Sequence, residues 1–104
     1  MSHGDGNTTD ESERWLVVNG RRWRRTDPSL PGDLVASLKS QLGSARAAVK
    51  SARASGDDEA LAAARRRVGL AKQGLGERGP AWWDESEDDR FRRATRALDE
   101  LTGG

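Results

Sequence analysis

The sequence predicts a small, mainly α-helical protein that begins with a β-hairpin. Apolar residues recur every three or four positions in three segments, which is the period of one face of an α-helix. The dipeptide Asn19-Gly20, a strong turn signal, separates two short runs of strand-forming residues. We therefore expect a β-hairpin (about 15–25), an antiparallel helical hairpin (about 32–54 and 58–75) and a third helix (about 85–101).

Composition limits what the chain can be. With 104 residues, of which 34% are hydrophobic, it is long enough for one small domain, expected over residues 14–102. Residues 1–13 hold four acids, no base and almost nothing to bury, which predicts a disordered acidic tail. There is no cysteine, no apolar run near the ~18 residues of a membrane span and no apolar signal region. We expect a cytoplasmic protein without membrane contact.

The stretch WLVVNGRRWRR predicts the geometry of the β-hairpin. A two-residue turn pairs Trp15 with Arg24, which predicts a cation–π contact between them. Side chains alternate along a strand, so Leu16, Val18 and Trp23 share one face. An isolated hairpin is marginal in water, so we expect this face to pack on the helices, with Trp23 in the core.

Two apolar stripes predict the helical hairpin, and alanines alternate with larger residues so that the backbones can approach closely. The short connection ASGDDE requires antiparallel neighbours. Within it, Gly56 ends the first helix and Asp57 or Asp58 caps the second, while Asp27 or Ser29 is expected to cap the first. The stripes are Val35, Leu38, Leu42, Ala45, Val49 and Ala52, then Leu61, Ala64, Val68, Ala71 and Leu75.

The third helix follows the segment GPAWWDES, in which Asp84 or Ser86 can cap it. The sequence leaves open whether it lies along the other two helices or caps one end. The β-hairpin precedes the first long helix, and Trp82 and Trp83 follow the second, so all four tryptophans reach the same end of the helical hairpin. We expect Trp23 and at least one of that pair to close the core there.

Three stretches, WLVVNGRRWRRTDP, AAARRRVGLAKQGLGERG and WWDES, resemble a family of small uncharacterised actinobacterial proteins. Members of this family are often labelled as Tol-type biopolymer transporters. The resemblance covers about residues 15–90 and implies an actinobacterial source and a mainly helical single domain. It implies no activity for any residue, and transport is not predicted, because the sequence has neither a span nor a signal.

The residue types do not indicate an enzyme. The one histidine, His3, lies in the predicted tail, so acid–base chemistry would fall on carboxylates. The acidic cluster at 84–89 lacks the spacing of a calcium loop, and the glycines of GLGERG follow a helix instead of opening one. We therefore predict no catalytic residue, no metal site and no cofactor.

Arginine and tryptophan suggest binding functions, since residues 14–79 hold fourteen bases and six acids. Our first hypothesis is a non-enzymatic interaction protein that contacts a protein partner, or a second copy of itself, through its Trp/Arg-rich end. The alternative is a nucleic-acid-binding protein that uses the Arg-rich β-hairpin and basic helix faces. The helix bases are Arg46, Lys50 and Arg53 on the first long helix, and Arg65, Arg66, Arg67 and Lys72 on the second. The candidate binding residues are Arg21, Arg22, Arg24, Arg25, Arg65, Arg66, Trp15, Trp82 and Trp83.

Overall fold

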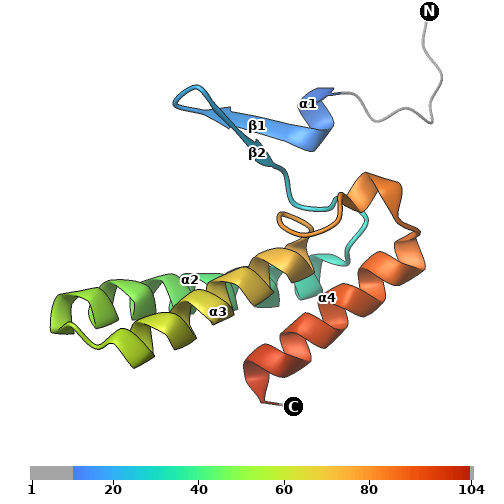
Figure 1. Cartoon of the computed structure of the whole chain (residues 1–104). Helices are drawn as coiled ribbons and strands as arrows, with labels where there is room; N and C mark the ends of the chain where they lie inside the picture. The colour runs from blue at the N-terminus through green and yellow to red at the C-terminus, as the bar shows by residue number, and fades with distance from the viewer. Residues whose placement is uncertain (1–10, 104) are drawn as a thin grey trace, which may run out of the picture.

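A computed structural model describes residues 11–103 and confirms a mainly helical protein that begins with an antiparallel β-hairpin (Figure 1). The three long helices pack together, and the β-hairpin projects from one end of them. In chain order the elements are α1 (Glu11–Arg14), β1 (Trp15–Val18), β2 (Arg21–Arg24), α2 (Gly32–Ser55), α3 (Asp58–Leu75), the 3-10 helix η1 (Trp82–Asp84) and α4 (Glu87–Thr102).

The described chain begins inside the predicted tail. Residues 1–10 lie outside the described residues, whereas residues 11–13 belong to the helical turn α1. Two hydrogen bonds hold this turn to the end of the β-hairpin. The backbone N–H of Arg25 donates to the carbonyl of Arg14 (2.8 Å), and the Arg25 Nε donates to the carbonyl of Ser12 (2.7 Å).

The β-hairpin has the predicted register, with Trp15 opposite Arg24. Asn19 and Gly20 both have positive φ, 53° and 78°, as a type I′ turn requires. The hairpin does not pack its apolar face on the helices, however. Trp23 is 41% exposed, so the prediction that it fills the core is wrong.

The end of the core is closed by other side chains, which explains why Trp23 stays outside. Trp82 and Leu30 are 3% and 8% exposed, and the Trp82 Nε1 donates to the Arg25 carbonyl (3.0 Å). The Trp82 indole therefore lies under the segment that leaves the hairpin. Leu16 and Val18, which share a face with Trp23, are exposed for the same reason.

The helical hairpin is antiparallel and close to its predicted bounds. Gly56 ends α2 in the left-handed conformation (φ 71°), and Asp57 caps α3 by accepting a hydrogen bond from the Ala60 N–H (3.0 Å). Small side chains allow α2 and α3 to approach closely. The buried alanines of this seam are Ala45, Ala52, Ala64 and Ala71.

The sequence left open whether α4 lies along the other two long helices or caps one end. In the structure it packs along them as the third helix of a bundle. It runs back along the part of α3 nearest the β-hairpin, and the turn between α2 and α3 extends beyond it (Figure 1). Ser86 caps α4 by accepting from the Asp89 N–H (3.1 Å). Ala94 and Ala97 are buried in the shared core, whereas Phe91 of α4 is 48% exposed.

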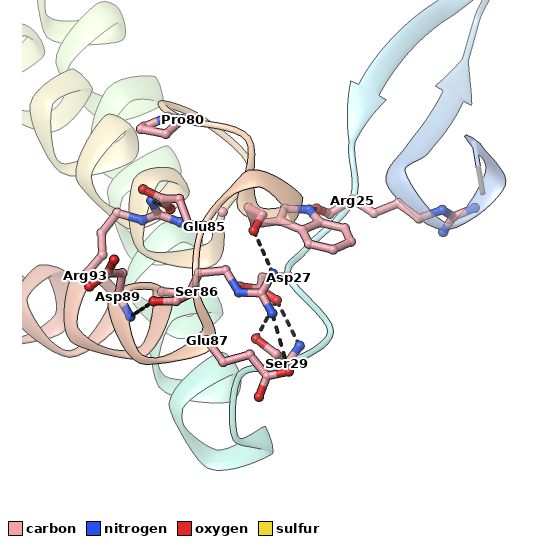
Figure 2. A network of polar contacts seen from close by, with 12 residues as sticks. Arg25, Asp27, Ser29, Pro80, Glu85, Ser86, Glu87, Asp89 and Arg93 are labelled. Carbon is pink, nitrogen blue, oxygen red and sulfur yellow. Dashed lines mark hydrogen bonds and ion pairs between the residues drawn. The ribbon is translucent and has the colours of Figure 1, made fainter. Parts of the chain in front are cut away.

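The start of α2 differs from the prediction, because neither Asp27 nor Ser29 caps it. The N-cap is Pro31, without a side-chain hydrogen bond. The Asp27 carboxylate is buried instead, where Oδ1 accepts from the N–H (2.9 Å) and hydroxyl (2.8 Å) of Ser29. Its Oδ2 lies 3.2 Å from the Nε of Arg90 in α4, an ion pair without the alignment of a hydrogen bond (Figure 2).

Gly74 of α3 lies where the three long helices meet. A Cβ there would lie 2.9 Å from the Ala97 Cβ and 3.0 Å from the Leu38 Cδ2. We expect Gly74→Ala to lower the free energy of unfolding by about 1–3 kcal/mol, because overpacking outweighs the gain in helix propensity. Gly43→Ala is the matched control, since a Cβ on Gly43 meets nothing within 4 Å. It should raise the free energy of unfolding by about 0.5–1 kcal/mol.

Urea unfolding of both variants measures the difference. Equal effects of the two substitutions would contradict the close approach of α3 and α4 at this glycine.

Candidate functional site

A cleft of about 730 Å³ lies between the β-hairpin and the helices, and we call it the hairpin cleft. One side is apolar and consists of Leu16, Val18 and Trp23. The alternation along the strands that predicted a shared face is therefore correct, but this face lines a cleft. Five bases make up most of the remaining lining: Arg24, Arg25, Lys39, Arg46 and Lys72.

Two of the five bases have structural partners. Arg24 Nη1 donates to the carbonyls of Pro80 (3.1 Å) and Gly76 (3.4 Å), which fastens β2 to the segment after α3. Arg25 Nε donates to the carbonyls of Ser12 in α1 (2.7 Å) and Trp15 in β1 (3.1 Å). These two arginines therefore help to position the β-hairpin, whereas Lys39, Arg46 and Lys72 on the helices have no such bond in the described chain.

Positive charge outweighs negative charge in the cleft. Glu77 is the one acid among the described residues that line it, and its carboxylate accepts a hydrogen bond from the Thr26 hydroxyl (2.7 Å). Within the described chain, Lys39, Arg46 and Lys72 form no ion pair. Such a cluster of cations favours an anionic ligand.

A second hollow, of about 360 Å³, continues this basic surface along α2 and α3. Arg46 lines both hollows, so they adjoin. Lys39, Arg46 and Arg53 are seven residues apart, as are Arg65 and Lys72, and a spacing of seven keeps side chains on one helix face. We call the bases that line the two hollows from the helical side the basic face: Lys39, Arg46, Arg53, Arg65, Lys72 and Arg78.

Arg78 joins the basic face from outside the two long helices. A Cβ at Gly69 of α3 would lie 3.3 Å from the Arg78 Nη1, so the guanidinium rests against a bare stretch of helix backbone. The segment after α3 thus folds Arg78 back onto the helix. This placement depends on the path of the chain, and no local pattern in the sequence indicates it.

Lys72 is the base most affected by its surroundings. Partial burial lowers the pKa of the Lys72 ammonium below its ordinary value of 10.5; the charges of Arg78 and Arg46 lower it further, and Glu77 raises it. The ammonium lies 5.4 Å from the ring centroid of Trp23, and the guanidinium of Arg21 lies 4.6 Å from the same ring. An exposed indole with two cations beside it is thus part of the cleft.

The three tryptophans of the predicted site form a cluster that joins the β-hairpin to η1. Trp83 contacts Trp15 (5.5 Å between centroids) and Trp82 (5.1 Å), both edge to face. Arg22 lies over Trp15 (4.2 Å). The predicted contact of Trp15 with Arg24 is wrong, because the Arg24 guanidinium is held by backbone carbonyls. Trp82 is buried and cannot meet a ligand.

The adjacent arginines Arg65 and Arg66 lie on different sides of α3. Arg65 lines the basic face, whereas Arg66 lines a separate hollow with Glu100 and Leu101 of α4. The nine predicted residues therefore do not form one surface. Sequence analysis missed Lys39, which its spacing from Arg46 could have indicated, and it placed Trp23 in the core.

Among residues 11–103, no group of three or more His, Cys, Asp and Glu side chains could hold a metal ion. None of the helices in this range combines the length and apolar character that crossing a bilayer requires.

Comparison with known proteins gave no relative. No protein-family model, no curated protein and no solved structure matches this chain. The resemblance to small actinobacterial proteins therefore stays a prediction, and function has to be inferred from the geometry of the site.

The lowered pKa of Lys72 predicts a pH dependence of stability. Unfolding restores an ordinary pKa, so the unfolded chain binds this proton more tightly than the folded protein does. The free energy of unfolding should therefore rise as the pH rises toward 10.5. The sequence has no tyrosine or cysteine, so at this pH the side chains that titrate are the lysines.

Lys72→Met should abolish this rise without lowering the free energy of unfolding at neutral pH. Lys50→Met is the control, because Lys50 is exposed on α2 and lines neither hollow. Thermal or urea unfolding across this pH range provides the measurement. A rise that persists in Lys72→Met would show that the proton is bound elsewhere.

Proposed function

We propose that this protein binds nucleic acid through the basic face and catalyses no reaction. The observation that carries the proposal is the charge of the two adjoining hollows. Six bases of the described chain line them from the helical side, and Glu77 is the one acid among their described lining residues. Ligands that carry several negative charges are favoured by such a surface, because each phosphate that meets a base releases bound counterions.

The length of the basic face favours a chain of phosphates over a small anion. From Lys39 to Arg53 the face extends by fourteen residues of α2, which is about 21 Å at a rise of about 1.5 Å per residue. A single phosphate group would occupy one of the two hollows. A nucleic-acid strand can contact the bases of both, with Arg46 at the point where they adjoin.

The sequence of the helical hairpin supports the same ligand. Residues 34–56 and 60–76 together contain eight bases and no acid. The acids of the helical hairpin lie instead at its two ends. Asp33 lies at the start of α2, and Asp57, Asp58 and Glu59 lie at the turn between α2 and α3. A phosphate backbone along these helices therefore meets no carboxylate between the ends. Arginine, the commoner base here, also donates two parallel hydrogen bonds to phosphate.

Contact with a protein, or with a second copy of this chain, is the second candidate function. Val17, on the face of the β-hairpin opposite the cleft, is 63% exposed, and Phe91 of α4 is also exposed. Exposed apolar side chains mark an interface when they gather into a contiguous patch. They lie on separate elements, however, whereas the bases of the basic face adjoin one another.

Two neighbouring arginines test the proposal. Arg65→Ala removes a charge from the basic face, and Arg66→Ala removes the same charge from the side of α3 that faces α4. In about 20 mM salt, Arg65→Ala should weaken the binding of a fluorescent oligonucleotide about tenfold and reduce the salt slope by about one, while Arg66→Ala should change little. Fluorescence anisotropy at several salt concentrations measures both quantities.

Three results would contradict the proposal. The first is no binding of any oligonucleotide by the wild-type protein at low salt, and the second is an equal loss in both variants. The third is equally tight binding of poly-glutamate of the same charge. A free protein that sediments as a dimer, and returns to one chain on Val17→Lys, would favour the second candidate.

A further inference from the structure

Trp23 differs from the other three tryptophans of the chain. Those three pack on one another, whereas Trp23 has no aromatic neighbour among residues 11–103 and lines the hairpin cleft. Its exposed ring lies beside Arg21 and Lys72. An indole between apolar side chains and cations offers a stacking surface next to groups that bind phosphate.

We propose that the hairpin cleft holds an unpaired base of a single-stranded nucleic acid, stacked on Trp23. This inference rests on the proposed function and specifies the class of nucleic acid. The base lies against the indole and beside Leu16 and Val18, and the adjoining phosphates lie on Lys72 and Arg46. The strand then continues along the basic face toward Arg53.

The dimensions of the cleft agree with one base and its sugar. A volume of about 730 Å³ is within the ~300–1,000 Å³ of sites for small organic groups. Every base has a flat aromatic face, so stacking on Trp23 demands no particular sequence. The affinity should therefore depend little on which base is present. It should depend strongly on whether a base is free to stack on Trp23.

A duplex fits this site less well. Its bases are stacked in the interior of the double helix, and none can enter a cleft between a hairpin and helices without leaving its partner. The arginines of the β-hairpin and of the residue that follows it also have contacts within the protein, which a groove of the duplex would have to replace. Arg24 and Arg25 donate to backbone carbonyls, and Arg21 and Arg22 lie over the rings of Trp23 and Trp15.

The test compares two strands of about 12 nucleotides that have the same phosphates. One is an ordinary single strand, and the other is abasic throughout. The wild-type protein should bind the ordinary strand about 10- to 100-fold more tightly than the abasic one, and more tightly than a duplex of the same length. This comparison needs no variant and therefore does not depend on whether a substituted protein folds.

Trp23→Leu should remove the preference for the ordinary strand and leave the affinity for the abasic strand unchanged. Phe91→Leu is the matched control, because Phe91 is an exposed aromatic residue on α4, outside the cleft, and its loss should change neither affinity. Urea unfolding checks that both variants are folded.

The outcomes separate the two proposals. Equal affinity of the wild-type protein for ordinary and abasic strands, or a duplex bound as tightly as the single strand, would overturn the stacking site and leave the proposed function standing. An undiminished preference for the ordinary strand in Trp23→Leu would also overturn it. No binding of either strand at low salt would overturn both.

Discussion

The buried ion pair between Asp27 and Arg90 is the contact on which the arrangement of this protein depends. The two side chains are 2% and 8% exposed and come from segments that are far apart in the sequence. The Asp27 N–H donates to the Leu75 carbonyl (2.9 Å), and Arg90 Nη1 donates to the Trp82 carbonyl (2.6 Å). The segment before α2, the end of α3, η1 and α4 therefore meet at one junction. Because an unpaired buried charge is strongly destabilising, these segments must adopt their positions together.

The same junction creates the hairpin cleft. Trp82, held from both sides by Arg25 and Arg90, fills the end of the core, so the β-hairpin cannot pack its apolar face there. The face that carries Trp23 therefore faces Lys39 and Arg46 of α2 and Lys72 of α3 across the cleft. Two groups of arginines thus differ in their partners: Arg24, Arg25 and Arg90 near the junction, and Arg46, Arg53 and Arg65 along the helical hairpin. Those near the junction are bound to carbonyls or carboxylates, and those along the helical hairpin have charge available for a ligand.

Local signals predicted the secondary structure, because each depends on residues only a few positions apart. Asn19-Gly20 formed its turn, Gly56 ended α2, and Ser86 capped α4. The site required knowledge of packing that no local signal contains. Alternation predicted the residues that share a face with Trp23 but could not tell that this face would remain exposed. A helix-capping pattern at Asp27 could not reveal a partner in α4. The turn of the helix places Arg65 and Arg66 on different sides of α3, but it cannot tell which side α4 covers.

A double-mutant cycle on the junction tests its role most directly. The measurement is the free energy of unfolding of Asp27→Asn, Arg90→Met and the double variant. If the ion pair holds the segments together, each single substitution should cost about 3–5 kcal/mol, and the double variant should lose at least about 1 kcal/mol less than the sum. Additive losses, or a single substitution that changes stability by less than about 0.5 kcal/mol, would contradict the dependence of the fold on this pair.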